Sequence, residues 1–163
     1  MRDSIEDWQK ILAAGFTSVQ ELLKYLDLPV ELGSNTAEGL FKTRVPRSFA
    51  AKMQRGNPND PLLLQVLATQ QELAIDPEYS TDPLAENAAN PIPGLIHKYS
   101  SRVLLTLTGV CAINCRFCFR RHFSYADNNP GQQGWQQAIA YIQKDPLIQE
   151  VILSGGDPLL ASD

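Results

Sequence analysis

Two short apolar segments on either side of an amphipathic segment constrain the fold of this chain more than any other feature. Residues 102–108 and 150–154 are rich in β-prone side chains, and the first is apolar enough for a strand buried on both faces. Residues 135–144 lie between them and have apolar side chains at helical spacing, at Trp135, Ala138, Ile139 and Ile142. This order predicts a parallel βαβ unit and an α/β fold.

Each predicted strand runs directly into a loop of unusual composition. The only cysteines of the chain follow residues 102–108, and Gly155 and Gly156 follow the second strand. In parallel α/β folds, functional residues gather in loops at the carboxyl ends of the strands. We therefore expect the two loops to form one functional site.

The residues before this unit are expected to form a mostly helical region. Apolar side chains recur at helical spacing in residues 5–12 and 19–26, and shorter helices are predicted in 46–55 and 62–73. The region ends in a proline-punctuated linker, residues 76–94.

These patterns predict two domains, 1–94 and 95–163. The second holds only the first βαβ part of a barrel, which in full needs roughly 200 residues or more. The sequence therefore predicts an α/β barrel that stops after its second strand.

Charge and hydropathy exclude several classes of partner. The chain has 14 basic and 18 acidic residues and a net charge of −4, which does not favour binding to nucleic acid or to an anionic membrane. It contains no apolar run of about 18 residues or more. The N-terminal residues lack the apolar core of a signal peptide. We expect a cytoplasmic protein.

The three cysteines have the spacing C-x3-C-x2-C, at Cys111, Cys115 and Cys118. An odd, clustered set in a chain without an export signal favours metal or cluster ligation over disulfides. Three thiolates can hold three irons of a [4Fe–4S] cluster and leave the fourth iron open. S-adenosylmethionine (SAM) can chelate that iron, and its reductive cleavage gives a radical that abstracts hydrogen. A non-catalytic zinc module, in which His122 is the fourth ligand, is the alternative.

The glycine loop is the second candidate binding site. Gly155 and Gly156 allow a ligand to approach the backbone closely, and Ser154 and Asp157 have side chains suited to the methionine end of SAM. The alternative is a plain turn in which Asp157 caps the helix that follows.

Arginines and a tyrosine complete the set of candidates. Arg120 has the fork geometry that binds a carboxylate, whereas Arg121 suits a solvated basic charge. From the residue types alone, Tyr99 suits a packed aromatic and Arg102 a surface charge.

Five motifs together resemble the lysine 2,3-aminomutase family of radical SAM enzymes, in particular its elongation factor P branch. They are Thr43-Arg-Val-Pro-Arg-Ser-Phe49, Gly56-Asn-Pro-Asn-Asp-Pro-Leu62, Pro93-Gly-Leu-Ile-His-Lys-Tyr99, Cys118-Phe-Arg-Arg-His-Phe123 and Ser154-Gly-Gly-Asp-Pro-Leu159. The resemblance covers nearly the whole chain, as an N-terminal portion of the family.

The resemblance implies a partial TIM-like barrel of six βα units and an isomerase that uses pyridoxal 5′-phosphate (PLP) with SAM and the cluster. The implied reaction converts L-α-lysine to (R)-β-lysine for the modification of elongation factor P. By position, Arg120 matches the arginine that binds the lysine carboxylate, and Tyr99 and Arg102 match residues near PLP.

The sequence departs from the family in its extent. The lysine that anchors PLP in the family and the acidic residues for the substrate ε-ammonium have no counterpart here. We therefore expect the 163-residue chain alone to be inactive. Another radical SAM reaction remains a further alternative.

Overall fold

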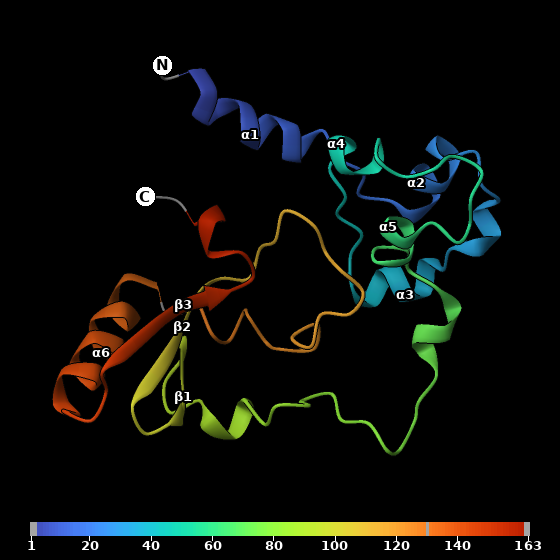
Figure 1. Cartoon of the computed structure of the whole chain (residues 1–163). Helices are drawn as coiled ribbons and strands as arrows, with labels where there is room; N and C mark the ends of the chain where they lie inside the picture. The colour runs from blue at the N-terminus through green and yellow to red at the C-terminus, as the bar shows by residue number, and fades with distance from the viewer. Residues whose placement is uncertain (1–2, 130, 162–163) are drawn as a thin grey trace. The chain divides into compact units, whose positions relative to one another are not determined.

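The chain forms two units of tertiary contacts in a computed structural model that describes residues 3–129 and 131–161 (Figure 1). The first unit contains Met1–Pro77 and Ala112–Arg121, and the second contains Glu78–Cys111 and His122–Asp163. The structure thus divides the chain after Pro77, whereas the sequence placed the boundary at Gly94. It also assigns the segment 112–121, which carries two of the cysteines, to the first unit.

The first unit consists of short helices. They are α1 (Asp3–Ala13), α2 (Val19–Tyr25), η1 (Val30–Leu32), α3 (Asn35–Leu40), α4 (Arg47–Ala50), α5 (Pro61–Leu64) and η2 (Gln70–Leu73). The apolar face of α2 supplies the centre of the core, where Val19, Leu22 and Leu23 are fully buried. Asp60 caps α5 by accepting hydrogen bonds from the backbone N–H groups of residues 62 and 63.

The helix predicted in residues 62–73 is wrong, because α5 ends at Leu64. The backbone of Ser34 donates a hydrogen bond of 2.8 Å to the carbonyl of Ala68, which ties this stretch to a segment distant in sequence. Leu63, Val66 and Leu67 remain buried in the same core. Apolar spacing alone did not reveal this break, because the broken segment buries the same side chains that a helix would bury.

The second unit is built on a three-stranded sheet in the order β1-β2-β3. Its elements are η3 (Asn87–Ala89), β1 (Leu95–Tyr99), β2 (Arg102–Thr108), α6 (Gly131–Lys144), β3 (Glu150–Gly155) and η4 (Pro158–Leu160). β2 pairs in parallel with β3, from Arg102 opposite Glu150 to Thr106 opposite Ser154. The predicted parallel βαβ unit and the mixed α/β class are confirmed.

The sequence did not predict β1, which pairs antiparallel to β2 through a short turn. Helix α6 packs its apolar side chains, among them Trp135 and Ala138, with Leu95 and Val103 of the two strands. The hydroxyl of Tyr141 lies 2.8 Å from Nδ1 of His97, which links α6 to β1. The predicted linker ends at Gly94, and β1 begins at the next residue.

Within the described part of the chain, no helix has both the length and the apolar character needed to cross a membrane.

Candidate functional site

The loops that follow β2 and β3 lie side by side, as the sequence predicted. The backbone N–H of Gly156 donates to the carbonyl of Thr108 at 2.6 Å, and that of Asp157 donates to the carbonyl of Val110 at 2.9 Å. These bonds continue the parallel pairing of the strands past their carboxyl ends. The start of the cysteine loop and the glycine loop therefore form one edge of the second unit.

Gly155 and Gly156 are required by this close approach. A Cβ added to Gly155 would lie 2.3 Å from the carbonyl oxygen of Thr108, and one added to Gly156 would lie 2.4 Å from that of Val110. Gly155 also has φ of +121°, a conformation that side-chain-bearing residues rarely adopt. The two glycines thus keep the backbones of both loops in contact.

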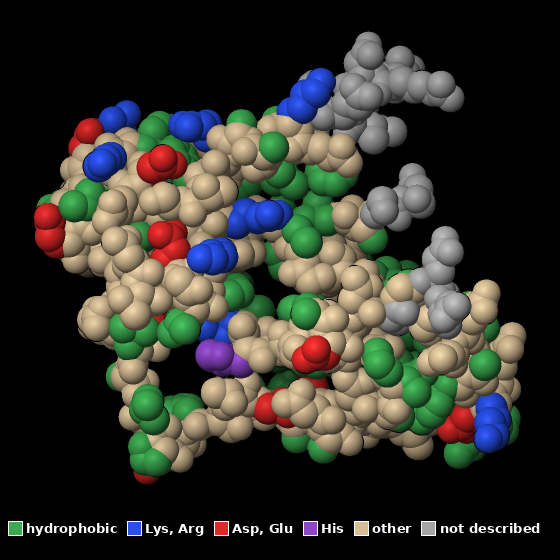
Figure 2. Space-filling model, turned by 180° about the vertical axis from the view of Figure 1, so that it is seen from behind, with side chains coloured by type: hydrophobic (Ala, Val, Ile, Leu, Met, Phe, Trp, Pro, Cys, Tyr) green, Lys and Arg blue, Asp and Glu red, His purple; other side chains and the backbone are tan. Residues whose placement is uncertain are grey.

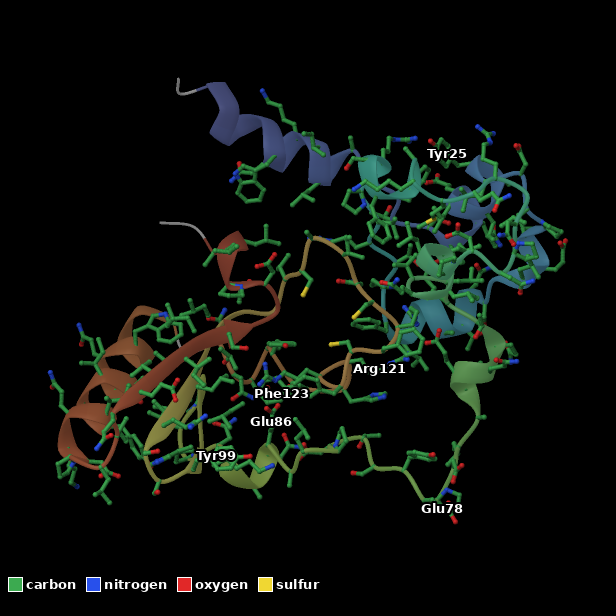
Figure 3. All side chains as sticks on the ribbon, viewed as in Figure 1. Tyr25, Glu78, Glu86, Tyr99, Arg121 and Phe123 are labelled. Carbon is green, nitrogen blue, oxygen red and sulfur yellow. The ribbon has the colours of Figure 1, made fainter. Side chains whose placement is uncertain are left out.

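Tyr125 braces the same two loops, and sequence reasoning missed it. Its hydroxyl donates to the carbonyl of Gly155 at 2.9 Å, and its ring leaves no room for a side chain at Gly109. The ring of Phe123, which is labelled in Figure 3, meets the Tyr125 ring edge to face at 5.0 Å. Nothing near Tyr125 in the sequence indicates this role, because the role depends on contacts with Gly109, 16 positions earlier, and with Gly155, 30 positions later.

Asp157 caps the turn that follows the glycine loop. Its Oδ1 accepts a hydrogen bond of 3.1 Å from the backbone N–H of Leu159, at the start of η4. The capping interpretation of Asp157 is therefore confirmed. Its predicted contact with SAM, like that of Ser154 at the end of β3, stays a prediction.

A hollow of about 490 Å³ adjoins the end of β2. Its lining residues are Leu107, Thr108, Trp135, Leu160 and Ala161. This volume is within the range of roughly 300–1,000 Å³ that is usual for small-molecule sites. The edge formed by the two loops thus has space beside it for a ligand.

The three cysteines of the motif are divided between the two units. Cys111 belongs to the second unit, whereas Cys115 and Cys118 belong to the first. Across residues 3–129 and 131–161, no group of three or more His, Cys, Asp or Glu side chains is arranged to hold a metal ion. None of the cysteines forms a disulfide, Cys115 is exposed, and the other two are partly exposed. Both the cluster and the zinc alternative with His122 stay predictions.

The segment 112–121 is anchored firmly in the first unit. The backbone N–H of Arg116 donates to the carbonyl of Gln65 at 2.7 Å, and the side chain of Asn114 donates to the carbonyl of Lys42 at 2.9 Å. Arg116 is itself buried and forms an ion pair with Glu72. Burial alone would raise the pKa of Glu72, but hydrogen bonds from Arg116, the Thr69 N–H and Arg121 hold that pKa below its usual value.

The two arginines after Cys118 are both largely buried. Arg120 is 7% exposed and its guanidinium lies 4.9 Å from the Phe119 ring centroid. Its predicted contact with a substrate carboxylate stays a prediction. Arg121 is not the solvated charge that the sequence suggested. Its side chain is 15% exposed and donates to Glu72 at 2.7 Å.

Tyr99 and Arg102 lie at the opposite end of β2 from the two loops. They face each other across the β1–β2 pair, with the guanidinium 5.8 Å from the Tyr99 ring centroid, and Arg102 pairs with Glu150 at 3.2 Å. Arg102 is a surface charge as expected, but Tyr99 is 61% exposed and is not packed. Glu86 and Tyr99, which are labelled in Figure 3, line a small pocket together with Arg102. Thr108 follows Arg102 by six positions along the strand, a distance of roughly 20 Å.

The relatives that this chain is similar to share the name L-lysine 2,3-aminomutase. No protein-family model matches the chain. The L-lysine 2,3-aminomutase of Escherichia coli is 50% identical over 98% of the chain, and that of Haemophilus influenzae is 46% identical over 97%. The L-lysine 2,3-aminomutase of Clostridium subterminale is 36% identical over 96% of the chain. The chain spans 47% of the length of the first two proteins and 38% of the third. Across nearly its whole length, this chain is similar to proteins named L-lysine 2,3-aminomutase, and it spans less than half of their length.

Proposed function

We propose that this chain supplies the cluster-binding and SAM-binding part of an L-lysine 2,3-aminomutase that converts L-α-lysine to (R)-β-lysine. One observation carries the proposal: the loops after β2 and β3 are fixed side by side by Gly155 and Gly156, and the first of them leads into the cysteine motif. This is the edge of a parallel α/β sheet where ligands bind. The identity with relatives of that name supports the choice of reaction.

The cysteine motif fits a [4Fe–4S] cluster by its donor chemistry. Three thiols lie within eight residues, outside disulfides and at least partly exposed. We propose that Cys111, Cys115 and Cys118 hold the cluster and leave one iron open to SAM. These thiolates would hold the cluster in place, and the chemistry that it would supply is the electron for reductive cleavage of SAM.

The glycine loop fits the methionine end of SAM. Its backbone is immobilised against β2, and Ser154 and Asp157 stand at its two ends. We propose that Asp157 accepts a hydrogen bond from the SAM ammonium group while it caps η4. The hollow beside Thr108 is large enough for part of the cofactor.

PLP and lysine are proposed on the resemblance alone. Tyr99 and Arg102 lie at the far end of β2, where Arg102 pairs with Glu150. In this geometry they do not fit a PLP that shares the site of the two loops, so no step is assigned to them. Arg120, which is 7% exposed, remains the proposed partner of the lysine carboxylate.

The proposed architecture is a partial barrel of six βα units. Support comes from β3, where Val151, Ile152 and Leu153 are 43%, 36% and 56% exposed. Figure 2 shows hydrophobic side chains on the surface of the part that holds α6 and β3. Consecutive apolar residues on a strand are typical of a parallel sheet that is covered on both faces. Because its relatives are about twice as long, we expect the 163-residue polypeptide by itself to be inactive.

Anaerobic reconstitution of the protein at its natural full length tests the proposal. With iron, sulfide, SAM, PLP and a reductant, we expect a brown protein that forms β-lysine from L-lysine. A colourless protein with a single bound zinc would favour the non-catalytic module. A brown protein that cleaves SAM but leaves lysine unchanged would favour another radical SAM reaction. The use of β-lysine to modify elongation factor P is part of the proposal, and transfer of the product to that factor tests it.

Replacing Tyr125 by phenylalanine is expected to weaken SAM binding several-fold and to lower stability by about 1 kcal/mol, the usual net contribution of one hydrogen bond. The variant loses the hydroxyl that holds the carbonyl of Gly155. Tyr141→Phe is a matched control, because it removes a tyrosine hydroxyl that bonds to His97 between α6 and β1. SAM affinity by equilibrium dialysis and stability by urea denaturation separate the two effects. Equal SAM affinities in both variants contradict the role of Tyr125.

A further inference from the structure

A buried carboxylate of the first unit binds two arginines of the cysteine segment at once. Oε1 of Glu72 accepts a hydrogen bond of 2.9 Å from Nε of Arg116, and its Oε2 accepts from Nη2 of the same residue. Nη2 of Arg121 donates to Oε2 of Glu72 at 2.7 Å. The three side chains are only 13%, 5% and 15% exposed, in the order Glu72, Arg116, Arg121. Ionic hydrogen bonds shielded from water in this way are strong and directional.

Helix α3 completes the binding site for these arginines. Arg116 donates to the carbonyl of Phe41 at 2.6 Å and to that of Ala37 at 3.4 Å. The guanidinium groups of Arg116 and Arg121 lie 5.0 and 5.3 Å from the Phe41 ring centroid. The carbonyls at the carboxyl end of a helix favour cations. Both arginines are therefore held by partners that lie far away in sequence.

The sequence positions of the arginines determine what this clamp immobilises. Arg116 directly follows Cys115, and Cys118 lies between Arg116 and Arg121. The side chain of Arg116 points into the unit, whereas Cys115 and the neighbouring Phe117 are exposed. Fixing the two arginines thus fixes the backbone on both sides of Cys118, and the two residues that flank Arg116 face outward.

We propose that Glu72 is a positioning residue for the iron–sulfur cluster, and that it holds Cys115 and Cys118 in their binding geometry through Arg116 and Arg121. The inference rests on the proposed cluster. Outer-shell partners of metal ligands commonly change metal affinity about 10–100-fold when they are replaced. Glu72 is one step further out than such partners, so we expect release of iron to a chelator to accelerate by about tenfold in Glu72→Gln.

The control is a carboxylate of the same unit that does not bind the cysteine segment. Asp60 is also buried, at 7% exposure, and it accepts hydrogen bonds from the backbone N–H groups of residues 54, 62 and 63. Asp60→Asn removes a buried negative charge from the first unit, as Glu72→Gln does. Both variants are made in the protein at its natural full length and reconstituted anaerobically. Glu72→Asp is the second variant, because it keeps the charge but is too short to reach both arginines.

The readouts are thermal stability, iron per chain, the rate of iron release to a chelator and the EPR spectrum of the reduced cluster with SAM. The inference is supported if Glu72→Gln releases iron faster and has a broader EPR signal than the wild type, while Asp60→Asn matches the wild type in both. If Glu72→Gln does not fold, Glu72→Asp is expected to show the same two changes. Release rates and spectra of the Glu72 variants that match those of Asp60→Asn overturn it and leave the proposed function intact. A wild-type protein that takes up no cluster overturns both.

Discussion

Replacement of Cys115 by serine in the protein at its natural full length is expected to abolish stable cluster binding and to reduce formation of 5′-deoxyadenosine by more than about 100-fold. Replacing an outer-shell partner of a metal ligand lowers metal affinity or activity by up to about 100-fold, and the loss of a ligand itself is more severe. Serine has nearly the same shape but lacks the thiolate that iron–sulfur clusters require. Cys115 is exposed, so the substitution does not disturb a packed core. Iron analysis and chromatography of the nucleoside product measure both effects.

His122→Ala is the matched control for this prediction, because His122 is a ligand only in the zinc alternative. It should retain iron at the wild-type level. If His122→Ala loses its metal while Cys115→Ser keeps the ability to form deoxyadenosine, the cluster assignment is wrong. Serine variants at Cys111 and Cys118 are expected to behave like the Cys115 variant.

Alanine at Gly155 or Gly156 is expected to destabilise the second unit by roughly 2–4 kcal/mol, the range for strained backbone combined with a buried clash. The added Cβ atoms would lie 2.3 and 2.4 Å from carbonyl oxygens of the loop after β2. Neither oxygen belongs to a flexible side chain that can move aside, so the backbones of the two loops must separate. SAM binding should fall in parallel, because its proposed site is formed by these backbones. Urea denaturation followed by circular dichroism measures the loss.

Gly39→Ala provides the comparison. Gly39 lies in α3, and a Cβ there would have no heavy atom within 4 Å. Alanine at this position should leave stability unchanged or raise it by up to about 1 kcal/mol, since alanine favours a helix over glycine. If Gly155→Ala and Gly156→Ala are as stable as Gly39→Ala, the close approach of the two loops is not a feature of the folded protein.

The sequence predicted the elements of the second unit well because their patterns are local. The strand of residues 102–108 and the parallel strand after α6 are confirmed, since their apolar side chains and the helix between them identify a βαβ unit. The placement of the glycine loop beside the start of the cysteine loop followed from the same pattern. Local signals failed where distant contacts decide, as in the break after Leu64, where the carbonyl of Ala68 binds the N–H of Ser34.

The residues of the candidate site also fall into those that local patterns reveal and those that only distant contacts reveal. Residue types and spacing alone identified the cysteines and Gly155 and Gly156. They did not identify Glu72 or Tyr125, although the Thr69-x-x-Glu72 pattern, in which Oε1 of Glu72 accepts from the Thr69 N–H, was a readable signal for a helix start. No pattern connects Glu72 with Arg116 and Arg121, which lie 44 and 49 positions away.

The sequence by itself determined which chemical groups this protein has and the parallel βαβ unit of β2, α6 and β3, because side-chain type and periodicity are properties of neighbouring residues. Only the tertiary structure decided that the segment 112–121 belongs to the first unit and that Glu72 is its partner. Buried ions must find opposite charges or hydrogen-bond partners wherever the fold provides them. Such partners are selected by distance in space, which the order of residues along the chain does not encode locally.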